Sequence, residues 1–122
     1  MKTDIVTAED IKTLVDSFYK KVDKDELLSP VFNLQAEVDW EHHLPKMYEF
    51  WGTQLIGAAN YKGQPFPPHM KLSINTTHFE RWQKLFIETV DELFEGPTAE
   101  LAIYKAKNIA TVFQYKLGLI KE

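Results

Sequence analysis

Apolar residues in this chain recur at helical spacing almost everywhere along its length. In the clearest stretch, Ile11, Leu14, Val15, Phe18 and Val22 follow one another at positions i, i+3, i+4, i+7 and i+11. This spacing places all five side chains on one face of an α-helix, where they can be buried against neighbouring helices. The pattern therefore predicts an all-α fold.

Capping patterns and helix breakers predict where the helices begin and end. The stretches Thr7-Ala-Glu-Asp10 and Thr77-His-Phe-Glu80 both resemble capping boxes. Gly96 is predicted to end the second of these helices, and Pro97 to stand at the first position of the last one. Residues 58–76 contain one glycine and three prolines, so we expect a loop with at most short helical turns.

Length and composition restrict the class of protein. The chain has 122 residues, enough for one domain with a real core, and we predict a single domain over residues 1–122. It contains no cysteine, which excludes disulfides, thiolate metal sites and covalent haem attachment. The start of the chain does not resemble a signal peptide, so we expect a cytoplasmic protein. The net charge of −4, with acids and bases interspersed, favours neither nucleic acid nor membrane as a partner.

The stretch "WEHHLPKMYEFW" sets two histidines among large apolar side chains. At about 100° per residue, His43 lies on the same helix face as Trp40 and Met47, whereas His42 points away from that face. Pro45 loosens this inference, because it has no N–H for the preceding turn and the helix is free to kink or restart there. We predict a helix from about residue 39 to Gly57 with His43 facing inward.

Residues alone leave several interpretations of the histidines open. His43 is equally explained as a core histidine whose ring nitrogens bond to the backbone. His69 lies just after two prolines, in a segment that cannot form a regular helix, so something else must fix its position. Zinc is not favoured, since there is neither an H-E-x-x-H motif nor a cysteine. An aromatic content of 13% fits either a Phe-rich core or a core that holds a flat guest molecule.

Five segments, taken together and in order, resemble the group III truncated haemoglobins. They are "SFYKKV", "LLSPVF", "WEHHLPKMYEFW", "YKGQPFPPHMKL" and "HFERWQKLF". The likeness extends from about Thr7 to Phe113. It implies a two-over-two helical sandwich around a non-covalently bound haem b, with iron as its metal.

The resemblance also implies a role for individual residues. His69 corresponds to the proximal ligand of the iron, and Tyr19 and His43 correspond to the distal tyrosine and histidine. Trp82 corresponds to the tryptophan that lines the ligand pocket. His42 stays open as an alternative to His43, because of Pro45 between the two halves of the helix.

Further residues are expected to contact the haem itself. Phe32 corresponds to the phenylalanine that packs against the haem plane, and Met47 is expected to line the distal cavity. The remaining haem contacts are predicted at Phe50 and Phe79, with Lys71 and Arg81 as partners of the propionates.

These assignments predict a protein that binds O₂, NO and CO at a five-coordinate haem iron. These assignments leave open whether the protein is also an enzyme. A polar distal side is equally suited to NO dioxygenation or a peroxidase-like reaction, which would need a reductase partner. A third alternative, of another class, is a haem-free helical interaction module.

Overall fold

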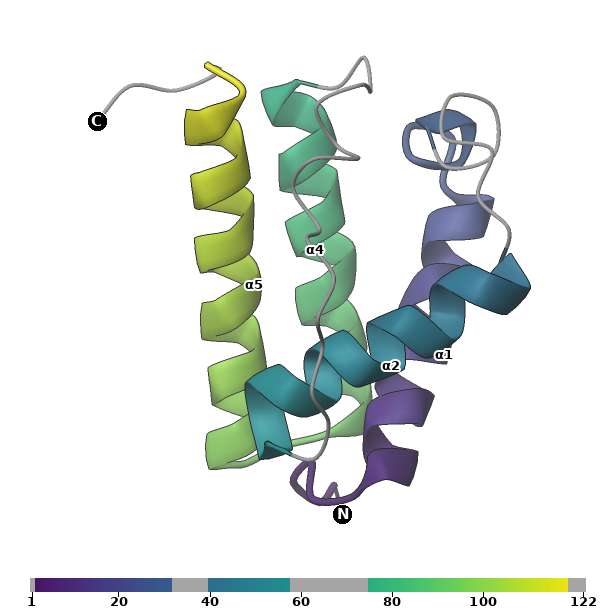
Figure 1. Cartoon of the computed structure of the whole chain (residues 1–122), viewed down its shortest axis with the longest axis vertical. Coiled ribbons are helices and arrows are strands. Elements are labelled where there is room, and N and C mark those ends of the chain that lie inside the picture. Colours follow the sequence, from purple (N-terminus) through teal and green to yellow (C-terminus); the bar gives the residue numbers. More distant parts are fainter. Residues whose placement is uncertain (1, 32–39, 58–74, 119–122) are drawn as a thin grey trace.

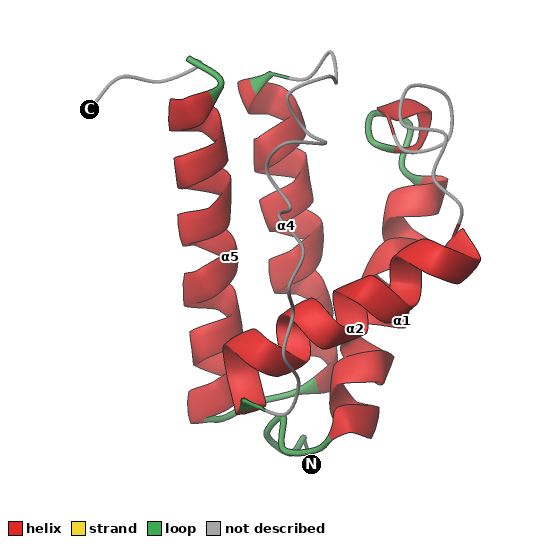
Figure 2. Cartoon of the chain, in the orientation of Figure 1, coloured by secondary structure: helices red, strands yellow, loops and turns green. Residues whose placement is uncertain are grey.

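The structure is a computed structural model and describes residues 2–31, 40–57 and 75–118. Within this part of the chain it contains helices and no β-strand, as the all-α prediction requires (Figures 1 and 2). None of these helices is both long and apolar enough to cross a bilayer. The four helices are α1 (Ala8–Lys24), α2 (Trp40–Ile56), α4 (Thr76–Leu93) and α5 (Pro97–Lys116).

The helices form two pairs. α4 and α5 run side by side in opposite directions, joined by a short turn at their ends, while α2 crosses α1 at a steep angle (Figure 1). α1 also packs on α4, and α2 also contacts α5, so the two pairs close on one another. This is the two-over-two arrangement that the resemblance predicted.

α1 begins and packs as its sequence predicts. The Thr7 hydroxyl accepts a hydrogen bond from the N–H of Asp10, and the Asp10 carboxylate accepts one from the N–H of Thr7. This reciprocal pair satisfies two N–H groups that the helix itself cannot. All five residues of the apolar stripe are buried, and so is Tyr19, which borders it. The predicted capping box and buried face are both confirmed.

The start and end of α4 differ from the prediction. The N-cap is Asn75, whose side chain accepts from the N–H of Thr77, and His78 completes the capping box in place of Glu80. Asn75, two residues before the predicted N-cap Thr77, takes this role because the short side-chain carbonyl of asparagine reaches the first free N–H groups at least as well as the threonine hydroxyl does. α4 then ends at Leu93, three residues before Gly96, with Phe94 in an extended conformation.

α2 runs without interruption through Pro45, so the helix does not restart there. Its end at Ile56, followed by Gly57 with φ +62°, agrees with the predicted stop. The predicted N-cap near residue 39 lies outside the described residues. Pro97 stands at the first position of α5, as predicted.

The N-terminal segment fastens the junction between α4 and α5. The Asp4 carboxylate accepts hydrogen bonds from the N–H groups of Thr98 (3.0 Å) and Ala99 (2.8 Å), so it caps α5 from 94 residues away. Gly96 makes this possible: its φ is +135°, and a Cβ there would lie 2.6 Å from the Cγ of Asp4. The N–H of Glu95 donates to the carbonyl of Thr3 as well.

A column of aromatic rings forms the centre of the core. Phe86 of α4 stacks on Trp51 of α2, with ring centroids 4.7 Å apart, and on Trp82 one turn away, at 5.8 Å. Phe18 of α1 meets both Trp82 and Phe86 edge-on, at 5.7 and 5.2 Å. Phe18, Trp51 and Phe86 are almost fully buried. The column thus fixes α1, α2 and α4 relative to one another and holds Trp82 in place.

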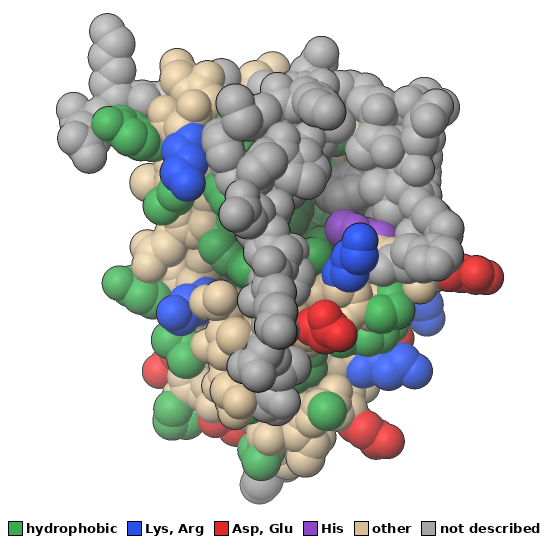
Figure 3. Space-filling view, viewed as in Figure 1, with side chains coloured by type: hydrophobic (Ala, Val, Ile, Leu, Met, Phe, Trp, Pro, Cys, Tyr) green, Lys and Arg blue, Asp and Glu red, His purple; other side chains and the backbone are tan. Residues whose placement is uncertain are grey.

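Charged side chains do not gather on the face viewed in Figure 3. Lysine and arginine side chains are interspersed there with aspartate and glutamate, and the described part of this face carries no extended basic surface. The described part of this face therefore adds nothing in favour of a phosphate-backbone partner.

Candidate functional site

Two polar rings from different helices meet inside the apolar core. The rings of Tyr19, on α1, and His43, on α2, lie edge to face, with centroids 5.3 Å apart and planes at 84°. Tyr19 is only 7% exposed, and the Nε2 atom of His43 is buried. A phenol and an imidazole can each donate and accept hydrogen bonds, so their meeting at one point of a largely apolar core marks a candidate site.

Burial also fixes the protonation of Tyr19. Because the charged form would lose its hydration, desolvation raises the pKa of the Tyr19 hydroxyl far above its ordinary value. The side chain is therefore a neutral phenol at any physiological pH. It keeps an O–H that can donate a hydrogen bond to a ligand.

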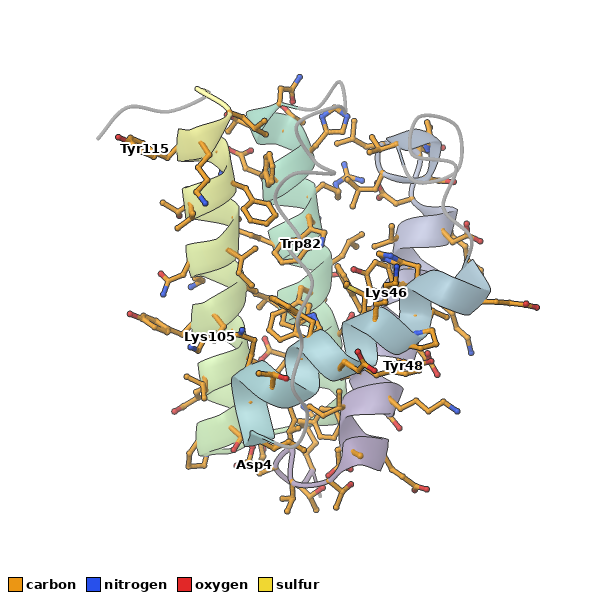
Figure 4. The ribbon with its side chains drawn as sticks, viewed as in Figure 1. Asp4, Lys46, Tyr48, Trp82, Lys105 and Tyr115 are labelled. Carbon is orange, nitrogen blue, oxygen red and sulfur yellow. The ribbon has the colours of Figure 1, made fainter. Side chains whose placement is uncertain are left out.

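Trp82 reaches the same region from α4. Trp82 is half-buried, and its ring meets the ring of Phe18 edge-on. Tyr19 contacts the same Phe18 ring, with ring centroids 4.8 Å apart. Trp82 and Tyr19 are thus both held by Phe18, which neither the apolar pattern nor the resemblance singled out as part of the site. Figure 4 shows Trp82 near the middle of α4.

Three further residues predicted to contact the cofactor line the interior. Met47 and Phe50, on α2, are half-buried and pack against the main core. Phe79, on α4, is buried in a smaller cluster with Ala110 and Phe113, and Trp82 packs against both clusters. These side chains offer apolar and aromatic surface of the kind that a flat macrocycle needs.

Arg81 has a partner that the sequence did not indicate. Its guanidinium donates to the carboxylate of Asp25 over 2.6 Å, and the Asp25 side chain is only 9% exposed. Burial opposes ionisation of Asp25, but the N–H groups of Leu28 and Leu27 and the Arg81 guanidinium outweigh it and lower the pKa of Asp25. The sequence does contain a signal for this turn. Asp25 directly follows α1, and an aspartate in this place commonly accepts hydrogen bonds from the N–H groups two and three residues later.

Four predicted residues fall outside what the structure describes. His69, Phe32 and Lys71 lie outside the described residues, and so does the side chain of His42. Their predicted roles, including the His42 alternative, are not tested. In the described ranges no three potential ligands among His, Asp and Glu converge on one point, so these ranges offer no multidentate metal site.

The described residues are compatible in chemical type with part of a haem site. Such a cofactor needs an apolar slot, one histidine nitrogen for the iron and polar donors on the opposite side. Trp82, Met47, Phe50 and Phe79 supply apolar surface, and Tyr19 and His43 supply buried polar groups. The axial histidine stays the prediction made for His69.

Comparison with known proteins gives concordant results. Residues 4–114 match the family model described as bacterial-like globin. The chain is 34% identical over 125 residues to the group 3 truncated haemoglobin Ctb of Campylobacter jejuni, covering 97% of this chain and 98% of that protein. The crystal structure of a group III truncated haemoglobin from the same organism superposes with a TM-score of 0.85 at 35% identity, over 96% of this chain and 95% of the other.

Proposed function

Because this chain belongs to the bacterial-like globin family, whose members bind ligands through haem, we propose that it carries haem b and holds O₂ or the related ligands NO and CO. The observation that supports this most directly is the contact between Tyr19 and His43 in the core. Both rings carry groups that donate and accept hydrogen bonds, so their convergence from two helices at one point of a largely apolar core suits a small polar ligand. We place the protein in the cytoplasm, as a single domain.

When bound, the haem would supply an iron that can bind a diatomic ligand. The residues of this chain determine how long the ligand stays. The neutral hydroxyl of Tyr19 and the indole N–H of Trp82 are donors that would hydrogen-bond to an electron-rich diatomic ligand held between them. Each such hydrogen bond contributes about 1.5–3 kcal/mol, which slows ligand release by roughly tenfold or more.

His43 supports Tyr19 from α2. The edge-to-face contact limits the positions that the phenol can take, so the hydroxyl is oriented before a ligand arrives. A preoriented donor loses less conformational freedom on binding than a mobile one. We therefore assign His43 to positioning Tyr19 as well as to bounding the pocket.

Among the cofactor-binding residues, His69 is proposed as the axial ligand, and Phe32, Met47, Phe50 and Phe79 as apolar contacts. Lys71 is the favoured partner for a propionate. Arg81 is a weaker candidate, because Asp25 already balances its charge. Its guanidinium nevertheless has five N–H groups, and one contact with Asp25 leaves others for a second acceptor.

Absorption spectroscopy of the purified protein with haemin tests the proposal. We expect a Soret band in the ferric, ferrous and CO-bound forms. His69→Gly should lose the native ferrous and CO spectra and regain them when imidazole is added, because free imidazole can replace the missing axial ligand. His78→Gln is the matched control, since His78 belongs to the N-terminal cap of α4. Unchanged spectra in His69→Gly would refute the axial assignment, and failure to take up haemin would refute the function.

A further inference from the structure

One side of α5 carries large apolar side chains into solvent. Among the described residues, four large apolar side chains are strongly exposed, and three of them lie on this helix: Tyr104 (61% exposed), Val112 (45%) and Tyr115 (51%). Figure 4 shows Tyr115 on the outer side of α5, pointing away from α4. A single exposed apolar residue is ordinary on a protein surface, but three on one helix face form a patch of the kind that a partner covers.

An exposed row with a symmetrical pattern runs along this face. Residues four apart are neighbours on a helix surface and together form a ridge. The row that starts at Glu100 continues with Tyr104, Asn108, Val112 and Lys116, and every one of these residues is exposed. It has an acid at one end and a base at the other, an apolar side chain next to each charge, and an amide at its centre.

A second copy of this row, laid antiparallel on the first, is complementary to it at every position. Glu100 faces Lys116 of the second copy, Tyr104 faces Val112, and Asn108 meets Asn108 at the two-fold axis. An amide both donates and accepts hydrogen bonds, so two copies of it can pair. Lys116 also interacts within its own chain, but its ammonium has three N–H groups and can serve a second acceptor. Ridges of this spacing pack with the helices crossed at about −50°, the commonest class of helix packing.

The charges of the row favour a second copy over other classes of partner. A phosphate backbone or an anionic membrane surface attracts a cluster of basic side chains, whereas this row carries one charge of each sign at its two ends. A row that is complementary to itself when reversed fits an isologous interface, in which the same surface serves both copies.

We propose that α5 forms a weak, two-fold symmetric dimer interface with a second copy of this chain, through the row from Glu100 to Lys116. This inference does not depend on the proposed function. Because one helix of each copy contributes, the interface is smaller than the roughly 800 Å² per partner of stable complexes. The association is therefore reversible, with a dissociation constant of roughly 10–500 µM.

Sedimentation equilibrium of the purified full chain, over concentrations that bracket this constant, tests the proposal. We expect the average mass to rise from monomer toward dimer with concentration. Tyr104→Glu places a charge in the apolar part of the row and should weaken association at least about tenfold. Thr13→Glu adds the same charge at an exposed position of α1 and should leave association unchanged, so it is the matched control. Circular dichroism verifies that both variants are folded.

Reversing the charges at the two ends tests the pairing itself. Glu100→Lys sets two lysines against each other across the interface, and Lys116→Glu sets two glutamates against each other, so each variant alone should associate more weakly than the native chain. An equimolar mixture of the two variants has opposite charges at both ends and should regain association as a heterodimer. A dimer formed through another surface would show neither the loss nor the recovery.

The chain has no cysteine, so one introduced thiol reports on the centre of the interface. In Asn108→Cys, the thiols of two copies meet at the two-fold axis. Association raises the effective concentration of the second thiol, so mild oxidation should form the covalent dimer at least about tenfold faster than in Thr13→Cys.

Three results would overturn the inference. The first is a native chain that stays monomeric over the whole concentration range. The second is a dimer that persists unchanged in Tyr104→Glu, and the third is an oxidation rate for Asn108→Cys no higher than that for Thr13→Cys. None of these results concerns haem uptake or CO binding, so the proposed function would stand or fall separately.

Discussion

Replacing Asp4 with alanine tests how much stability the N-terminal segment adds by capping α5. In the native protein, the Asp4 carboxylate accepts from the N–H groups of Thr98 and Ala99, two of the N–H groups in the first turn that no helical carbonyl can satisfy. Alanine has no acceptor, so water must replace the carboxylate at both groups. The change leaves the apolar core untouched.

The expected loss follows from helix capping. Loss of a capping side chain costs about 0.5–2 kcal/mol, and a negative charge at a helix N-terminus adds about 0.3–1 kcal/mol at low salt. Asp4 is only partly buried, so solvent screens part of the charge contribution. We therefore expect Asp4→Ala to lower the free energy of unfolding by about 1–2 kcal/mol. For a chain of this size that corresponds to roughly 4–8 °C in Tm.

Urea unfolding followed by circular dichroism, at equal haem loading, measures the loss. The midpoint should fall while the slope m is unchanged, because the surface exposed on unfolding is the same. Asp4→Asn is the matched control: it keeps an acceptor oxygen and removes the charge, so its loss should be smaller. A midpoint for Asp4→Ala equal to that of the native protein would refute the capping role.

The pH dependence gives an independent check. Burial raises the pKa of Asp4, but the N–H groups of Thr98, Ile5 and Ala99 outweigh it and hold the pKa below its ordinary value of 3.8. A lowered pKa in the folded state contributes stability above the unfolded value and loses it as the pH falls through the folded value. The difference between native protein and Asp4→Ala should thus be full at pH 7 and shrink below about pH 4. A difference that stays constant down to pH 2.5 would contradict this cause.

Three further predictions concern the candidate site and its surroundings. Tyr19→Phe should speed O₂ dissociation in stopped flow by about tenfold or more, because the phenol O–H is lost while the ring remains. Trp82→Phe should also speed it, and an unchanged rate in both variants would remove the hydrogen-bonding role. Arg81→Met should lower stability by about 1–2 kcal/mol in urea unfolding, since the largely buried Asp25 carboxylate loses its cation. Because the pKa of Asp25 then rises, acid unfolding should begin at a higher pH in this variant than in Lys84→Met, an exposed control on the same helix.

Much of the local structure could be predicted from the sequence. The apolar stripe and capping box of α1, the stop at Gly57 and the proline at the start of α5 depend on residues within four positions of one another. The predicted start of α4 was wrong by two residues. Asn75 and Thr77 are both good N-cap residues, and their capping free energies differ little. The sequence left open whether α2 kinks or restarts at Pro45, and the helix runs through it because packing on α1 outweighs the hydrogen bond that is lost.

The candidate site residues were identified from the five segments that resemble a known family. The hydrogen-bonding chemistry expected of them follows from their residue types. Periodicity placed Tyr19 at the edge of a buried stripe, and the resemblance pointed to His43 and Trp82. No local pattern, however, states that the rings of Tyr19 and His43 touch. That contact depends on the angle and offset at which α2 crosses α1.

The sequence by itself therefore determined which segments are helical and which faces are apolar, because these follow from spacings of three and four residues. The candidate site residues came from the resemblance to a known family. Only the tertiary structure decided the long-range pairs: Asp4 with the start of α5, Asp25 with Arg81, and Tyr48 with Asp16. These partners are 94, 56 and 32 residues apart. At such separations the pairing is set by how the four helices pack, and a polar side chain takes whichever donor or acceptor that packing brings within reach.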